Sequence, residues 1–186
     1  MPFEVRVPEV AELADGPPVE VVLENAHRKA VAVASGLSDA EAATSCVLGV
    51  DTVVVLGSRI FGKPRDEADT RQTLTALAGR RHAVLSGICL IEPGPAPLSV
   101  EPGPALRSPE PARVRTAAAR TAVEFRELDE TAIDAYLATG EWRGRAGGYA
   151  IQGAGAALVR SVEGDYLSVV GLPVATLLDL APWLAR

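Results

Sequence analysis

The spacing of apolar residues predicts several β-strands along the chain. Residues 46–56 form a β-branched run typical of a buried strand, and residues 80–92 carry a similar apolar pattern. Residues 119–128 are also predicted as a strand. The opening stretch 3–10 alternates between apolar and polar residues, which favours a strand. Residues 57–64 predict a turn followed by a short return strand.

Other segments show the spacing of helices. The apolar residues of stretch 19–35 recur every three to four positions and form one stripe along a helix. Residues 66–79 begin with acidic residues, which suit a helix N-terminus, and end with a glycine that stops the helix. Asp129 is placed to cap a third helix, and residues 172–184 predict a closing helix.

These elements alternate in blocks rather than strictly, which is typical of an α/β protein with a mixed sheet. We expect a single domain over residues 1–186. Half of the 14 prolines lie in residues 92–113, which we predict to be an extended insertion between two strands because proline cannot donate to a strand ladder. Residues 140–166 are glycine-rich and then strand-like.

Composition narrows the classes of partner. The formal net charge is −6 without a basic block, which argues against duplex nucleic acid because neutralising phosphates needs clustered Lys and Arg. No run is long and apolar enough to span a bilayer, and no signal peptide is evident, so we expect no membrane association and a cytoplasmic location. Cys46 and Cys89 lie in apolar runs and are predicted to be buried free thiols.

Four charged residues stand where a functional role would explain them. Glu12 follows the first predicted strand, and Lys29 lies at the edge of the apolar stripe of 19–35. Asp51 interrupts a buried strand, where a charge is costly unless it is paired or used, and Lys63 stands at a turn. If the four converge on one cleft, the carboxylates suit Mg²⁺ or Mn²⁺ and the ammonium groups suit phosphate oxygens.

Three of these residues also have a purely structural explanation. Asp51 fits a strand end satisfied by backbone amides, whereas Lys29 and Lys63 fit lysines whose ammonium groups reach water. Spacing alone does not show that the charged residues meet. No Walker A or dinucleotide-binding motif is present, and two histidines with two distant cysteines argue against a zinc site.

Seven segments of the chain match one enzyme family, in that family's order. They are PEVAE at 8–12, ENAHRKA at 24–30, GVDTVVV at 49–55, GKPRDEADTRQTLTALAGRRHAV at 62–84, VEFREL at 123–128, YLATGEWRGRAGGYAIQGAGA at 136–156 and GDYLSVVGLP at 164–173. This ordered set resembles the Maf family of nucleoside triphosphate pyrophosphatases, and it covers nearly the whole chain outside the proline-rich insertion.

The resemblance implies an α/β fold with an elongated mixed β-sheet, flanking helices and two lobes around a central cleft. It implies hydrolysis of a nucleoside triphosphate to the monophosphate and diphosphate, with a divalent metal cation, Mg²⁺ or Mn²⁺. A homodimer is the assembly that the family leads us to expect.

The resemblance also implies roles for individual residues. Asp51 matches the family's proton acceptor, and Glu12 and Lys63 match further catalytic groups, a cleft acid and a phosphate-binding lysine. Glu12 and Asp51 are the implied metal ligands, and Lys29 is an implied substrate-binding lysine.

Two positions bear on the choice of base. Thr52 and Gln152 match family positions tied to base choice, and their surroundings resemble the branch that acts on dTTP and UTP. The amide of Gln152 offers a donor and an acceptor, which suits the imide edge of thymine or uracil.

The chain departs from the family pattern in three places. The family usually begins with a strand and a Ser-x-Ser-Pro-Arg-Arg loop that cradles phosphates, and no segment here matches it, so the chain is expected to begin at the family's second strand. Ala11 replaces a frequent acid, and Arg145 replaces the usual lysine. The missing loop leaves one alternative, a nucleotide-binding or regulatory remnant with weak catalysis. A separate alternative is a purine-directed inosine triphosphate pyrophosphatase, against which the Asp51-Thr52 pair and the segment AGGYAIQG at 146–153 argue.

Overall fold

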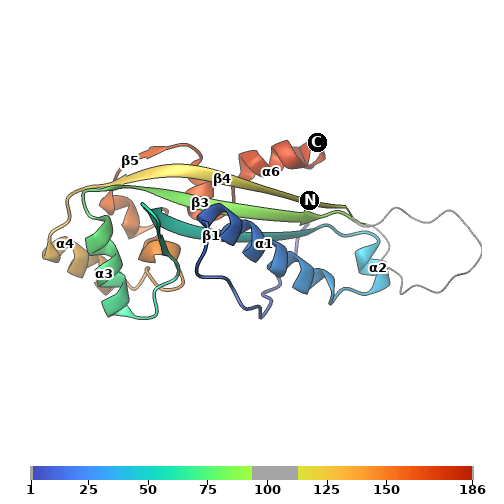
Figure 1. The fold of residues 1–186 in the computed structure, drawn as a ribbon, viewed down its shortest axis with the longest axis horizontal. Coiled ribbons are helices and arrows are strands. Elements are labelled where there is room, and N and C mark those ends of the chain that lie inside the picture. The colour runs from blue at the N-terminus through green and yellow to red at the C-terminus, as the bar shows by residue number, and fades with distance from the viewer. Residues whose placement is uncertain (1, 94–112, 186) are drawn as a thin grey trace, which may run out of the picture.

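The computed structural model of the chain describes residues 2–93 and 113–185 and has an α/β fold (Figure 1). The strands of its sheet are β1 (Val47–Leu56), β2 (Arg59–Phe61), β3 (Arg81–Ile91), β4 (Val114–Phe125) and β5 (Val159–Glu163). The α-helices are α1 (Pro18–Ala34), α2 (Asp39–Ala42), α3 (Glu67–Leu77), α4 (Glu130–Thr139), α5 (Tyr166–Val170) and α6 (Val174–Leu180). Three 3₁₀ turns are η1 (Ala146–Gly148), η2 (Ala154–Leu158) and η3 (Pro182–Ala185).

The strands lie in the order β2-β1-β3-β4-β5, and every pairing between described strands is antiparallel. The α/β class and the flanking helices are confirmed, but the expected mixture of parallel and antiparallel pairs is wrong for this part of the chain. β2 and β3 do run in the same direction, with α3 between them along the sequence. They form no parallel pair because β1 lies between them in the sheet.

Helix α1 lies unusually close to one face of β1 and β3. A Cβ atom placed on Gly49 would lie 2.2 Å from the carbonyl oxygen of Ala26, and one on Gly87 would lie 2.4 Å from that of Val22. Glycine is therefore required at both strand positions for the helix to approach this closely. Asp51 lies on the same face, two residues after Gly49 in β1 and paired with Gly87 of β3.

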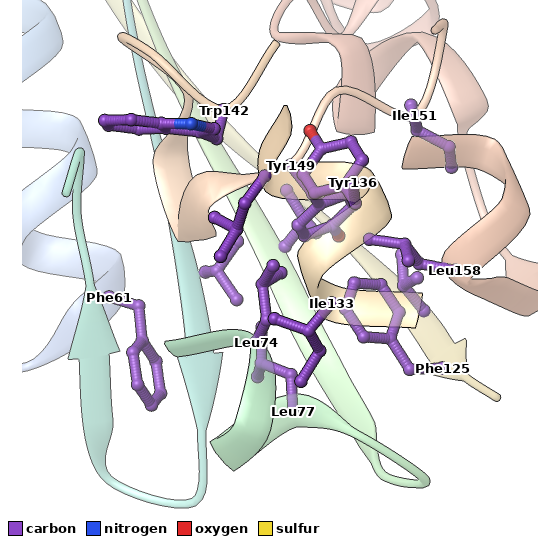
Figure 2. Packing of buried hydrophobic residues seen from close by; sticks show 14 residues of the cluster. Phe61, Leu74, Leu77, Phe125, Ile133, Tyr136, Trp142, Tyr149, Ile151 and Leu158 are labelled. Carbon is purple, nitrogen blue, oxygen red and sulfur yellow. The ribbon is translucent and has the colours of Figure 1, made fainter. Parts of the chain in front are cut away.

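The opposite face of the sheet carries the largest hydrophobic cluster (Figure 2). Its members come from the sheet, from α3 and α4, and from the segment after α4; those labelled in Figure 2 are Phe61, Leu74, Leu77, Phe125, Ile133, Tyr136, Trp142, Tyr149, Ile151 and Leu158. Figure 1 shows α3 and α4 gathered at one end of the sheet, far from α2. This packing fixes the segment after α4 against the sheet.

Two hydrogen bonds from backbone amides and one close contact place residues 144–152 beside β1. The amide of Ala150 donates to the Tyr136 hydroxyl at 2.9 Å, and the amide of Gly147 donates to the carbonyl oxygen of Gly62 at 2.9 Å. Gly147 has φ of +67°, and a Cβ there would lie 2.6 Å from Val54, so only glycine fits. The segment thus lies next to the turn that carries Lys63.

Several predicted elements are confirmed with small changes in their bounds. Asp66 and Asp129 cap α3 and α4, since each carboxylate accepts a hydrogen bond from the amide three residues later. The predicted closing helix is α6 followed by η3, and the glycine-rich stretch contains η1, η2 and β5. The short helices α2 and α5 were not predicted. Both cysteines are free, as expected, although Cys46 is only partly buried.

The strand predicted at residues 3–10 is wrong, because this stretch has no regular secondary structure. Its apolar residues Phe3, Val5 and Val7 are exposed. A strand needs hydrogen-bond partners on a neighbouring strand. No strand in the described part of the chain lies alongside residues 3–10.

The predicted insertion at 92–113 lies mostly outside the described residues, which stop at 93 and resume at 113. Its two ends are adjacent, because the amide of Glu92 donates to the carbonyl oxygen of Arg113 at 2.9 Å. The strands on either side, β3 and β4, are paired, so the insertion does connect two strands as predicted. In the described ranges, no helix has the length and apolar character needed to cross a membrane.

Candidate active site

A groove lies where α1, β1 and residues 144–152 meet. Its lining includes the side chains of Lys29, Asp51, Thr52, Lys63, Arg145 and Gln152, and apolar residues complete its walls. Of the six residues predicted as site residues, only Glu12 is not part of this lining. The structure therefore brings together residues that are widely spaced in the sequence.

The groove reaches both faces of β1. Asp51 and Thr52 are consecutive strand residues, so their side chains point to opposite faces. Asp51 lies on the face covered by α1, whereas Thr52 lies on the face of the hydrophobic cluster, with Val54. β2 pairs only with Val54–Leu56, so no described strand covers the edge of β1 beside Asp51 and Thr52. One ligand can therefore contact both side chains around this edge.

The four charged residues form one connected cluster. The Lys29 ammonium lies 2.6 Å from Oδ1 of Asp51 and 2.8 Å from Oε1 of Glu12. The Lys63 ammonium lies 3.9 Å from the same oxygen of Glu12. Asp51 is the most buried member, with 6% of its side chain exposed, whereas Lys63 is exposed. Glu12 joins the groove through the two lysines.

Asn25 is a member of the site that the sequence analysis missed. Its Nδ2 donates to Oδ2 of Asp51 at 3.2 Å and to the carbonyl oxygen of Leu13 at 3.0 Å. Its Oδ1 accepts from the amide of Leu13 at 2.7 Å. Asn25 thus joins Asp51 to the loop that carries Glu12. Asn25 and Lys29 are four residues apart and face the same way on α1, a spacing that could have revealed Asn25.

The pKa values of Lys29 and Glu12 favour the ionised forms of these two residues. Burial opposes the charge of Lys29, but the hydrogen bonds and charges of Asp51 and Glu12 outweigh it and raise the pKa of Lys29. Burial likewise opposes the charge of Glu12, but Lys29 and Lys63 outweigh it and lower the pKa of Glu12. The lysine and the acid therefore stabilise one another as ions.

The two carboxylates have the right chemistry for a divalent cation, but two side chains alone do not complete its set of ligands. Glu12 and Asp51 present oxygen atoms, the ligands that Mg²⁺ prefers, on either side of Lys29. Within residues 2–93 and 113–185, no group of three or more His, Cys, Asp and Glu side chains could hold a metal. A cation at Glu12 and Asp51 would therefore need oxygens from a phosphate or from water, which is common for Mg²⁺.

The groove of this α/β fold brings together carboxylates, lysines and an arginine. These groups define a protein able to bind a phosphate-bearing ligand. The family model described as Maf-like protein matches residues 1–182, and the chain belongs to this family. This confirms the resemblance found in the sequence.

Three relatives of the chain share one functional name. The dTTP/UTP pyrophosphatase of Bacillus cytotoxicus is 42% identical over 179 residues, which are 95% of this chain and 82% of the relative. A dTTP/UTP pyrophosphatase of Bacillus cereus is 40% identical over 179 residues, again 95% of this chain and 82% of the relative. That of Dictyoglomus thermophilum is 40% identical over 181 residues, 96% of this chain and 83% of the relative.

Proposed function

We propose that the protein hydrolyses dTTP and UTP, or modified pyrimidine triphosphates, to the monophosphate and diphosphate. The observation that carries this proposal is the connected cluster of Glu12, Lys29, Asp51 and Lys63 at one groove. The family of the chain and the names of its relatives support the same activity.

In this reaction Asp51 acts as the general base. It takes a proton from a water molecule as the water oxygen bonds to phosphorus at the α–β anhydride, and the bridging P–O bond breaks to release diphosphate. Lys29 and Asn25 each bind one oxygen of Asp51, which fixes the carboxylate in one orientation. Lys63 and Arg145 line the groove and supply positive charge to the phosphate oxygens.

A divalent cation, Mg²⁺ or Mn²⁺, would be held by Glu12 and Asp51. When bound, such a cation neutralises phosphate charge and polarises the phosphoryl oxygens. The residues of the chain keep their own tasks: Asp51 accepts the proton, and the lysines hold the triphosphate.

Base choice is assigned to Gln152 and Thr52 in the same groove. Gln152 is exposed there, and its amide can donate to a carbonyl oxygen on the imide edge of a pyrimidine. Thr52 lines the same groove from β1.

The proposal is tested by diphosphate release from dTTP, UTP, CTP, GTP and ITP with Mg²⁺, using the wild type and Asp51→Asn. We expect preference for dTTP and UTP, and a loss of about 10²- to 10⁴-fold in kcat for the variant because the general base is removed. Equal rates for the two proteins would remove Asp51 from the mechanism. Nucleotide binding by calorimetry without any hydrolysis would instead support a binding or regulatory protein, and preference for ITP would support the purine alternative.

A further inference from the structure

A hydrogen-bond chain of two hydroxyl groups and one backbone carbonyl runs from the groove into the core. Thr52 of β1 and Ser86 of β3 are paired in register, and Oγ1 of Thr52 lies 2.8 Å from Oγ of Ser86. Oγ of Ser86 in turn donates to the carbonyl oxygen of Ser168, on α5, at 2.8 Å. Ser86 is fully buried, with 0% of its surface exposed.

The directions of these hydrogen bonds follow from the number of protons. A hydroxyl has one proton to donate, and a carbonyl oxygen has none. The contact between Ser86 and the Ser168 carbonyl therefore uses the proton of Ser86. Ser86 must then accept in its contact with Thr52, so the proton of Thr52 points at Ser86. Toward the groove, Thr52 presents only lone pairs and acts as an acceptor.

We propose that Ser86 is a positioning residue that fixes Thr52 as a hydrogen-bond acceptor and thereby selects uracil and thymine over cytosine. This inference rests on the proposed function. Uracil and thymine carry a proton on ring nitrogen N3, which Thr52 accepts. Cytosine has a bare N3 with a lone pair, so it would face the lone pair of Thr52 without a proton between them. The arrangement favours UTP and dTTP over CTP and dCTP.

Burial makes this selection effective. Water cannot reach Ser86 to replace a lost partner, so reversing the hydrogen-bond chain would cost the Ser168 carbonyl its shorter hydrogen bond, at 2.8 Å, and leave it with that from the amide of Gly171 at 3.2 Å. A site built to accept a proton rejects an analogue that lacks it, because its own polar group is then left unpaired.

The test compares UTP with CTP in the wild type and in Ser86→Ala. Without the Ser86 oxygen, the Thr52 hydroxyl is free to rotate and to donate to N3 of cytosine. We expect the ratio of kcat/KM for UTP over CTP to fall about tenfold, with most of the change in the CTP value. Ser86→Thr keeps the hydroxyl and should keep the ratio.

Thr121→Ala is the matched control. Thr121 is also fully buried, and its hydroxyl donates to the carbonyl oxygen of Asp165 at 3.0 Å, close to Ser168 in the sequence but without a contact to Thr52. This variant should lose stability and keep the UTP/CTP ratio. If Ser86→Ala does not fold, Ser86→Cys replaces the hydroxyl with a weakly bonding thiol of similar size and should also lower the ratio.

The outcomes separate this inference from the proposed function. If the wild type prefers UTP and the ratio is unchanged in Ser86→Ala or Ser86→Cys, the inference is overturned while the function stands. Equal use of UTP and CTP by the wild type also overturns it. If the wild type hydrolyses no triphosphate, the proposed function fails. The ratio of the Kd values for UTP and CTP, measured by calorimetry in the same variants, then decides the role of Ser86.

Discussion

At the scale of single residues, Asp51 keeps its position because both of its carboxylate oxygens are bound. Lys29 binds Oδ1 and Asn25 binds Oδ2, and both side chains come from one face of α1. A buried carboxylate without such partners would favour its neutral form. The neutral amide of Asn25 does not change the charge of the site, so its contribution is to orientation.

We predict that Asn25→Ala lowers kcat roughly tenfold or more and changes KM less, because Asp51 loses its fixed orientation. The variant should also lose about 1–3 kcal/mol of unfolding free energy, since the backbone groups of Leu13 lose their buried partner. Steady-state kinetics and urea unfolding measure the two effects.

Arg28→Ala is the control for Asn25→Ala. Arg28 donates to the carbonyl oxygen of Ala11 and so holds the same loop, but it has no contact with Asp51. We expect a smaller loss of kcat in this variant. An equal loss in both variants would mean that Asn25 acts only by holding the loop.

At the scale of elements, the approach of α1 to the sheet sets the distance between Lys29 and Asp51. Gly49 and Gly87 let the helix backbone lie against the strands. The helix, its apolar stripe and the strand were all predictable from local spacing, because each pattern reflects one buried face. Their close contact was not, since glycine in a strand equally marks a bulge or a bend.

We predict that Gly49→Ala destabilises the protein by about 1–3 kcal/mol or more, because its Cβ would lie 2.2 Å from a backbone oxygen of α1 and 2.7 Å from a backbone nitrogen. The shift of α1 should also lower kcat by moving Lys29 away from Asp51. Gly36→Ala, whose Cβ would lie at an ordinary 3.6 Å from its nearest neighbour, should have little effect on either quantity. Thermal unfolding and diphosphate release measure both.

At the scale of the whole molecule, a histidine buried against the large hydrophobic cluster, His82, makes the stability of the protein depend on pH. His82 packs against the rings of Phe125 and Tyr149, which also contact each other, and its Nε2 is 3.0 Å from the Tyr149 hydroxyl. Burial lowers the pKa of His82 from 6.5 to about 4, although the nearby backbone of Arg80 opposes this shift.

We predict that the protein loses stability as the pH falls from about 6.5 to about 4. In this window His82 is protonated in the unfolded chain and neutral in the folded one, so the unfolded state binds more protons. At about 1.4 kcal/mol per pH unit, the full loss approaches about 3 kcal/mol. The free energy of unfolding in urea at pH 7 and pH 5 tests this. In His82→Gln, the free energy of unfolding should change less between pH 7 and pH 5 than in the wild type. An unchanged pH dependence would contradict the assignment of this effect to His82.

The sequence by itself determined the α/β class, most helices and strands, the cap of α4, and the family. These features are encoded locally or in ordered motifs, because the period of apolar residues reports which face of an element is buried. It did not determine strand direction or the fate of residues 3–10, because both depend on which strands lie side by side.

Only the tertiary structure decided which side chains meet. Glu12, Lys29, Asp51 and Lys63 are joined by contacts between separate elements, and no local period encodes such contacts. The hydrogen-bond chain from Thr52 through Ser86 to Ser168 spans sequence separations of 34 and 82 residues. Its hydrogen-bond directions are set by the partners that folding provides, because a hydroxyl can donate or accept until a neighbour fixes its proton.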